Sequence, residues 1–175
     1  NAYSGYAMRE TPTLFLEFHG TEAGVAEQAE RFGETAAAHG ALGFDWATRA
    51  EERNRLWDAR HKAYYACKAL RPGSRGWATD ACVPISRLAD CIAETKADLA
   101  RTDLMAPLVG HVGDGNFHLS ILIDPENDAE RAEAERLSGR IAERALRMGG
   151  TITGEHGVGL GKKPYMRAEH GEGWQ

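Results

Sequence analysis

The 175-residue sequence has few of the features that assign a chain to a class at once. Its three cysteines, Cys67, Cys82 and Cys91, show no CxxC spacing, which argues against a disulfide framework or a zinc ribbon and suits free thiols in a reducing compartment. No apolar run approaches the ~20 residues of a transmembrane segment, and no signal-peptide pattern opens the chain. Basic stripes are missing too, and the formal net charge of −5 argues against nucleic acid as a partner.

The length fits a single domain, residues 1–175, that can bury a sizeable core. The sequence begins at Asn1 rather than at methionine and stops at Gln175 in a polar, glycine-containing run. We therefore expect that both ends are truncated and that the chain is a piece of a longer protein.

Hydrophobic periodicity predicts an α+β fold. Strands are expected over residues 13–19, 42–48 and 76–83, and helices after N-caps at Thr21, Thr48, Ser86 and Asn127. Charged positions between the apolar stripes of these helices are expected to be solvated. The short, amphipathic strands favour helices packed on one face of a largely antiparallel sheet. A doubly wound parallel sheet is the alternative, but no glycine-rich turn follows the first strand.

The stretch Gly110-His111-Val112-Gly113-Asp114-Gly115-Asn116-Phe117-His118 predicts a β-hairpin between two apolar runs, residues 105–109 and 119–123. With a loop over residues 113–116, His111 would pair directly with His118, and both imidazoles would point to the same face. Two converging imidazoles make half of a metal site. A polar hairpin tip with two hydrogen-bonded histidines explains the pattern equally well.

A second unusual stretch, residues 151–163, is crowded with glycines and contains the adjacent pair Glu155 and His156. It does not match the phosphate-binding pattern GxxxxGK[ST], because residue 156 is histidine and residue 163 is lysine. Two histidines and one carboxylate with open positions form a catalytic metal constellation for zinc or another divalent ion. The fourth group, held beside the metal, could then serve as a base. Asp114 and Asn116 could also coordinate, although turn chemistry explains both.

Arg60 is an anomaly on the apolar stripe of the helix predicted after Thr48. A guanidinium in that position must find an anion or reach out to solvent. One interpretation is a structural salt bridge, for example to Asp80. The other is a bidentate clamp for the carboxylate of a substrate, which guanidinium geometry favours.

Several of these motifs together resemble a known family. The stretches GHVGDGNFH and GGTITGEHGVGLGKK are similar to the C-terminal domain of FAD-linked oxidases, a group that includes D-lactate dehydrogenases, glycolate oxidase subunits and D-2-hydroxyglutarate dehydrogenase. The stretches FLEFHGTEAGVAEQAE, LWDARHKAYYA, LRPG and TDACVPISRLAD are most similar to the cytochrome-linked D-lactate dehydrogenases. The resemblance runs from about Thr13 to about Gly171 and implies a ferredoxin-like α+β domain.

The resemblance also implies roles for residues at the two motifs. The metal ligands of the family match His111, His118 and Glu155, and the metal is expected to be zinc. His156 matches a proposed base that takes the hydroxyl proton of the substrate. Arg60 matches the arginine that holds the substrate carboxylate, which favours the clamp over the salt bridge. Glu155 and Gly157 are expected to bind the cofactor.

The function implied is the oxidation of a D-2-hydroxy acid, most readily D-lactate, with hydride transfer to FAD. The flavin-binding domain is absent from these residues, so it must come from the same chain or from a partner chain, and the electron acceptor is not specified. The location implied is cytoplasmic or peripheral to the membrane in a bacterium and mitochondrial in a eukaryote. A non-catalytic metal-binding module and a metal-dependent hydrolase remain as alternative functions.

Overall fold

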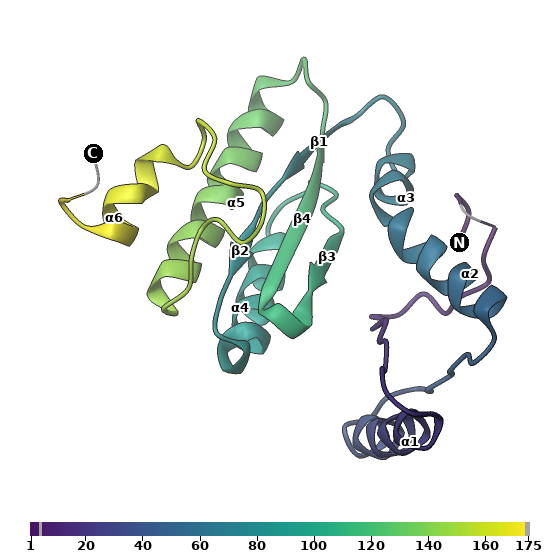
Figure 1. Ribbon diagram of the computed structural model, residues 1–175. Helices are drawn as coiled ribbons and strands as arrows, with labels where there is room; N and C mark the ends of the chain where they lie inside the picture. Colours follow the sequence, from purple (N-terminus) through teal and green to yellow (C-terminus); the bar gives the residue numbers. More distant parts are fainter. Residues whose placement is uncertain (4, 174–175) are drawn as a thin grey trace. The chain divides into compact units, whose positions relative to one another are not determined.

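A computed structural model describes residues 1–3 and 5–173 of the protein. The chain forms two compact units, Asn1–Ala63 and Tyr64–Gln175. Figure 1 labels their helices and strands.

The first unit contains two helices, α1 (Glu22–Ala38) and α2 (Ala50–His61). The predicted N-cap of α1 is confirmed, because the Thr21 side chain accepts a hydrogen bond from the Gly24 amide at 3.2 Å. Helix α2 begins at Ala50, two residues after Thr48, and its N-cap Arg49 makes no side-chain cap hydrogen bond. The predicted cap at Thr48 is therefore wrong, since its hydroxyl lies too early in the chain to reach the first free amides of the helix.

The strands predicted over residues 13–19 and 42–48 are also wrong. Within residues 1–3 and 5–63, neither segment forms a ladder with another. Alternating apolar residues suit a strand, but a strand also needs a partner for its N–H and C=O groups. One aromatic ring from each segment, Phe18 and Phe44, instead packs against Phe32 of α1, with ring centroids 6.1 and 5.2 Å apart.

The single helix predicted after Thr48 is divided at Lys62. The second part is α3 (Ala63–Ala69), in which Cys67 is buried. After α3, the chain turns at Gly73 and enters the sheet of the second unit.

The second unit is built on the central strand β4 (Asn116–Ile123), which is antiparallel to all its neighbours. On one side β4 pairs first with β1 (Arg75–Ala78) and then with β2 (Ala81–Cys82). On the other side it pairs with β3 (Leu108–His111). The single strand predicted over residues 76–83 is thus interrupted at Thr79 and Asp80.

Two long helices, α4 (Ile85–Leu99) and α5 (Asp128–Arg147), cover one face of this sheet (Figure 1). The Asn127 cap of α5 is confirmed, because its side chain accepts from the amides of Ala129 and Glu130. The Ser86 cap is wrong: α4 begins one residue earlier, at Ile85, so Ser86 lies inside the first turn. The remaining elements are η1 (Val112–Asp114), η2 (Lys163–Tyr165) and α6 (Met166–His170).

The order of elements is β-α-β-β-α-β, the connectivity of a ferredoxin-like fold. Its last strand is reduced to a backbone bridge between Thr151 and Cys82, with N–H···O distances of 3.0 and 2.8 Å. This bridge extends the sheet beyond β2, on the side away from β3. The predicted α+β class, with helices on one face of an antiparallel sheet, is confirmed.

The two faces of β4 have different characters. Its odd-numbered residues are buried against α4 and α5 in the main core: Phe117, Leu119, Ile121 and Ile123. Three of the four even-numbered residues are polar: Asn116, His118 and Ser120. Because successive strand residues point to opposite faces, these polar side chains lie on the face away from the two helices.

A buried ionic cluster joins α4 to α5, contrary to the expectation that charges on these helices are solvated. Arg144 is 4% exposed and binds Glu94, Thr95 and Asp98. Asp98 is 5% exposed and also pairs with Arg140. Charges this deeply buried need partners, and here each has more than one.

Candidate metal centre

The hairpin predicted around His111 and His118 is present, but its register differs from the prediction. His111 lies opposite Asn116, and His118 lies opposite Val109. The loop is one residue earlier than predicted because η1 occupies residues 112–114 and Gly115, with φ of +75°, closes it in the left-handed conformation. The pairing shifts by two positions in total, which keeps both histidines on the same face. Their rings lie diagonally, with centroids 6.5 Å apart.

The glycine-rich stretch from residue 151 approaches this polar face closely. At Gly154 an added Cβ would lie 1.8 Å from Asn116 Nδ2 and 2.7 Å from Asp80 Oδ1. Only glycine therefore fits between the loop and the strand side chains. This contact places the next two residues, Glu155 and His156, beside the histidines of the hairpin.

The structure brings the four predicted metal-site side chains together around one atom, Glu155 Oε1. It lies 2.6 Å from His118 Nε2 and 3.7 Å from His111 Nε2. His156 Nε2 is also 3.7 Å from it, and the His156 ring stacks on that of His118 with centroids 4.5 Å apart. Donors about 3–4 Å apart can share a cation whose bonds to nitrogen and oxygen are ~2.0–2.2 Å long.

The hydrogen bond of His118 determines which of its nitrogens is free. Its Nδ1 lies 3.1 Å from the Thr79 carbonyl oxygen, which can only accept, so Nδ1 carries the hydrogen. That carbonyl is available because the Leu119 amide donates to Thr79 Oγ1 instead, which also explains why the ladder is interrupted there. In the neutral ring, His118 Nε2 therefore presents a lone pair toward Glu155.

This lone pair is the strongest structural sign that a cation fits here. His118 Nε2 is buried and makes no aligned hydrogen bond within the described residues, although Glu155 Oε1 is 2.6 Å away. Two electron pairs at that separation repel each other unless a proton or a metal ion is shared between them. A metal-bound histidine commonly donates its other ring N–H to a carbonyl or carboxylate, as His118 does.

Asp80 is the central residue of the site that the sequence did not single out as functional. Its side chain is 1% exposed and accepts hydrogen bonds from the backbone amides of Glu155 and His156. It also accepts from Asn116 Nδ2 at 2.9 Å and pairs with Lys162 Nζ at 3.0 Å. Burial by itself would raise the pKa of Asp80, but these donors outweigh it and lower the pKa to about 2.

Asp80, His118 and His156 also offer ligand atoms within 4.8 Å of one another. Both Asp80 oxygens, however, already accept hydrogen bonds from N–H donors, namely Asn116 and the backbone amides of Glu155 and His156. Glu155 is 46% exposed and has lone pairs left for a metal ion. The donor set of His111, His118 and Glu155 is therefore the better fit.

Two further predicted site residues, Arg60 and Gly157, are not among these four side chains. Arg60 belongs to α2 in the first unit, and its part in the site stays a prediction. Within the second unit, Asp80 forms an ion pair with Lys162. The alternative of a salt bridge between Arg60 and Asp80 also stays a prediction. Gly157 follows the Glu155–His156 pair with φ of +72°, and its contact with a cofactor also stays a prediction.

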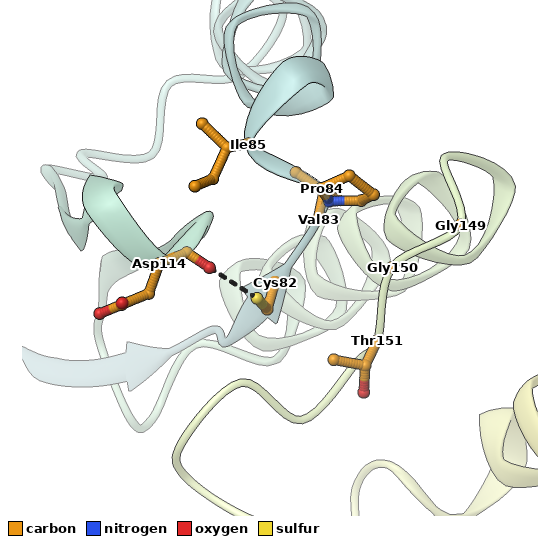
Figure 2. A pocket seen from close by; sticks show the side chains of 8 residues that line it. All are labelled: Cys82, Val83, Pro84, Ile85, Asp114, Gly149, Gly150 and Thr151. Atoms are coloured by element: carbon orange, nitrogen blue, oxygen red, sulfur yellow. Dashed lines mark hydrogen bonds between the residues drawn. The ribbon is translucent and has the colours of Figure 1, made fainter.

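A hollow beside the hairpin loop does not contain the predicted ligands. It is lined by Cys82, Val83, Pro84, Ile85, Asp114, Gly149, Gly150 and Thr151 (Figure 2). Cys82 Sγ donates to the backbone oxygen of Asp114 at 3.2 Å, and the Asp114 carboxylate points away from it. Asp114 therefore has a structural role in the loop at this place, as turn chemistry predicts.

Among the described residues, no helix has the length and apolar character needed to cross a bilayer.

Comparison with known protein families agrees with the family resemblance of the sequence motifs. The family described as FAD linked oxidases, C-terminal domain, matches residues 2–175. The chain belongs to this family, and the resemblance seen in its motifs is confirmed.

The relatives in this family include D-lactate dehydrogenases. A probable mitochondrial D-lactate dehydrogenase of Danio rerio is 49% identical over 171 residues, which cover 98% of this chain and 34% of the relative. A mitochondrial D-lactate dehydrogenase (cytochrome) of Arabidopsis thaliana is 43% identical, with 98% of this chain and 30% of the relative covered. The glycolate oxidase subunit GlcD of Escherichia coli strain K12 is 33% identical, with 95% and 33% covered. The chain thus spans about a third of the length of these relatives.

Proposed function

We propose that this chain is the substrate- and metal-binding part of a flavin-dependent D-2-hydroxy acid dehydrogenase, with D-lactate as the substrate and the 2-oxo acid as the product. The observation that supports it most is the buried His118 Nε2, which faces Glu155 next to His111 and His156 and makes no aligned hydrogen bond with residues 1–3 or 5–173. Two histidines and a carboxylate suit zinc with open positions for a substrate oxygen. A structural metal would need neither an adjacent third histidine nor a substrate-binding arginine.

In this proposal His111, His118 and Glu155 hold the metal ion and leave His156 free to act as a base. His156 is 45% exposed at the edge of the cluster, so its imidazole can reach a substrate hydroxyl and accept the proton. Arg60 binds the substrate carboxylate through its two-pronged guanidinium. When bound, a divalent metal supplies Lewis acidity that lowers the pKa of the substrate hydroxyl, and FAD supplies the hydride acceptor.

The proposal requires a flavin-binding domain that these residues do not include. We propose that this domain belongs to the same protein or to a partner chain, and that Gly157 and Glu155 face it. The relatives named above include mitochondrial proteins. By extension, a eukaryotic source would place this protein in mitochondria, and a bacterial source in the cytoplasm or at the membrane surface.

The first prediction concerns flavin reduction by the full-length protein. Mixed with D-lactate in the absence of oxygen, the purified protein is expected to bleach its flavin absorption band and to form the 2-oxo acid. L-lactate is the control and is expected to leave the flavin oxidised over the same time. If the full-length protein carries no flavin and does not oxidise D-lactate, the dehydrogenase function is wrong.

A further inference from the structure

Asp80 contacts three residues of the candidate metal centre, Glu155, His156 and His118, while both of its own oxygens accept hydrogen bonds from N–H donors. It lies opposite His118 in the shared register of β1, β2 and β4, so both side chains point to the same face. Its carboxylate receives the amides of Glu155 and His156 at 3.1 and 2.9 Å. Asp80 Oδ1 also lies 3.5 Å from His118 Nδ1.

The partners of Asp80 come from two other segments of the chain, β4 and the glycine-rich stretch of residues 151–163. Asn116 at the start of β4 and Lys162 near the end of that stretch complete the set of donors around Asp80. Gly154 permits the approach, since any side chain there would collide with Asn116 Nδ2 and Asp80 Oδ1. Without the carboxylate, the backbone amides of Glu155 and His156 would lose the acceptor that holds the loop against the strand.

We propose that Asp80 is a positioning residue, whose buried carboxylate holds Glu155 and His156 in place for metal binding and proton transfer. Glu155 is 46% exposed and His156 45%, so packing alone does not restrain their side chains. The hydrogen bonds from their backbone amides to Asp80 restrain the two residues instead, because these bonds fix the positions of both Cα atoms before any ligand binds. The proposal rests on the proposed metal-binding function of the same site.

The test is Asp80→Asn in the full-length protein, measured in two ways. Zinc affinity, determined by competition with a chelator at constant pH, is expected to fall about 10–100-fold. Hydrogen exchange of the amides in residues 151–162 of the metal-free protein is expected to accelerate at least about tenfold, because asparagine has one accepting oxygen in place of the two that Asp80 offers to Glu155, His156, Asn116 and Lys162.

Asp98→Asn is the matched control. It makes the same chemical change at a buried carboxylate in the helical layer, in contact with Arg144 and Arg140. It is expected to weaken α4 and α5 but to leave zinc affinity and exchange of the glycine-rich loop unchanged. If Asp80→Asn does not fold, Lys162→Met carries the test, with a smaller change in the same direction in both measurements.

The outcomes separate this proposal from the proposed function. If the parent protein binds zinc and Asp80→Asn changes neither zinc affinity nor loop exchange, the positioning role is wrong and the metal site stands. If the parent binds no zinc, the metal function fails, and accelerated loop exchange in Asp80→Asn still supports the positioning role. Equal loop exchange in Asp80→Asn and Asp98→Asn overturns it.

Discussion

Replacing His156 by asparagine is expected to lower kcat for D-lactate about 10²–10⁴-fold, the usual contribution of a positioned base. Asparagine keeps a polar side chain of similar reach but cannot accept the hydroxyl proton. His156 Nε2 lies 3.7 Å from Glu155 Oε1, and its backbone amide is held by Asp80, so the substitution leaves the ligands His111 and His118 intact. Metal content and KM are therefore expected to change little.

The measurement is the rate of anaerobic flavin reduction by D-lactate, with metal content determined on the same samples. His170→Asn is the control, since His170 is 50% exposed and lies beside Glu169 on α6. If His156→Asn loses its metal together with its activity, His156 is a ligand and not the base.

Replacing Arg144 by methionine is expected to destabilise the second unit by about 3–5 kcal/mol, because it leaves a buried charge without its partner. Asp98 is 5% exposed and would keep only the more peripheral Arg140. Thr95 and Glu94 would also lose hydrogen bonds to the guanidinium. Methionine preserves most of the side-chain volume, so the loss is chiefly ionic rather than a packing defect.

Native-state hydrogen exchange of α4 and α5 measures this free energy of opening directly. Arg136→Met on α5 is the matched control. Arg136 forms an ion pair with Glu133 one turn away and is 46% exposed, so its loss is expected to cost within about 0.5–1 kcal/mol. Equal effects of the two substitutions would contradict a structural role for the buried cluster.

The sequence correctly predicted those elements that are determined by residues close together in the chain. Thr21 and Asn127 are correct as N-caps because each has a side-chain acceptor directly before a helix with a clear apolar stripe. The hairpin was predicted by its turn residues between two apolar runs. Its register was not, because Asn116 enters the strand to bond Asp80 and Ala81, a contact between residues more than 30 positions apart.

The failures come from partners that lie far away in the sequence. Residues 13–19 alternate as a strand does, but a strand pattern does not say whether a partner strand exists. In the sequence, Arg144 is one of many charges on an amphipathic helix. The packing of α5 on α4 is what brings it into an ion pair with Asp98. Asp80 lies in the stretch TDACVPISRLAD, which carries part of the family resemblance, but that pattern alone gives it no place in the site. A further signal is Gly154, whose missing side chain implies a close approach to another part of the chain.

The metal content of the full-length protein tests the central claim most directly, that His111, His118 and Glu155 hold a divalent ion. We expect stoichiometric zinc in the parent protein and a large loss in both His111→Ala and Glu155→Gln, measured by elemental analysis after dialysis. His170→Ala and Glu143→Gln, both at exposed positions outside the site, are the matched controls and are expected to retain the parent's metal. If His111→Ala and Glu155→Gln keep the metal content of the parent, the ligand assignment is wrong.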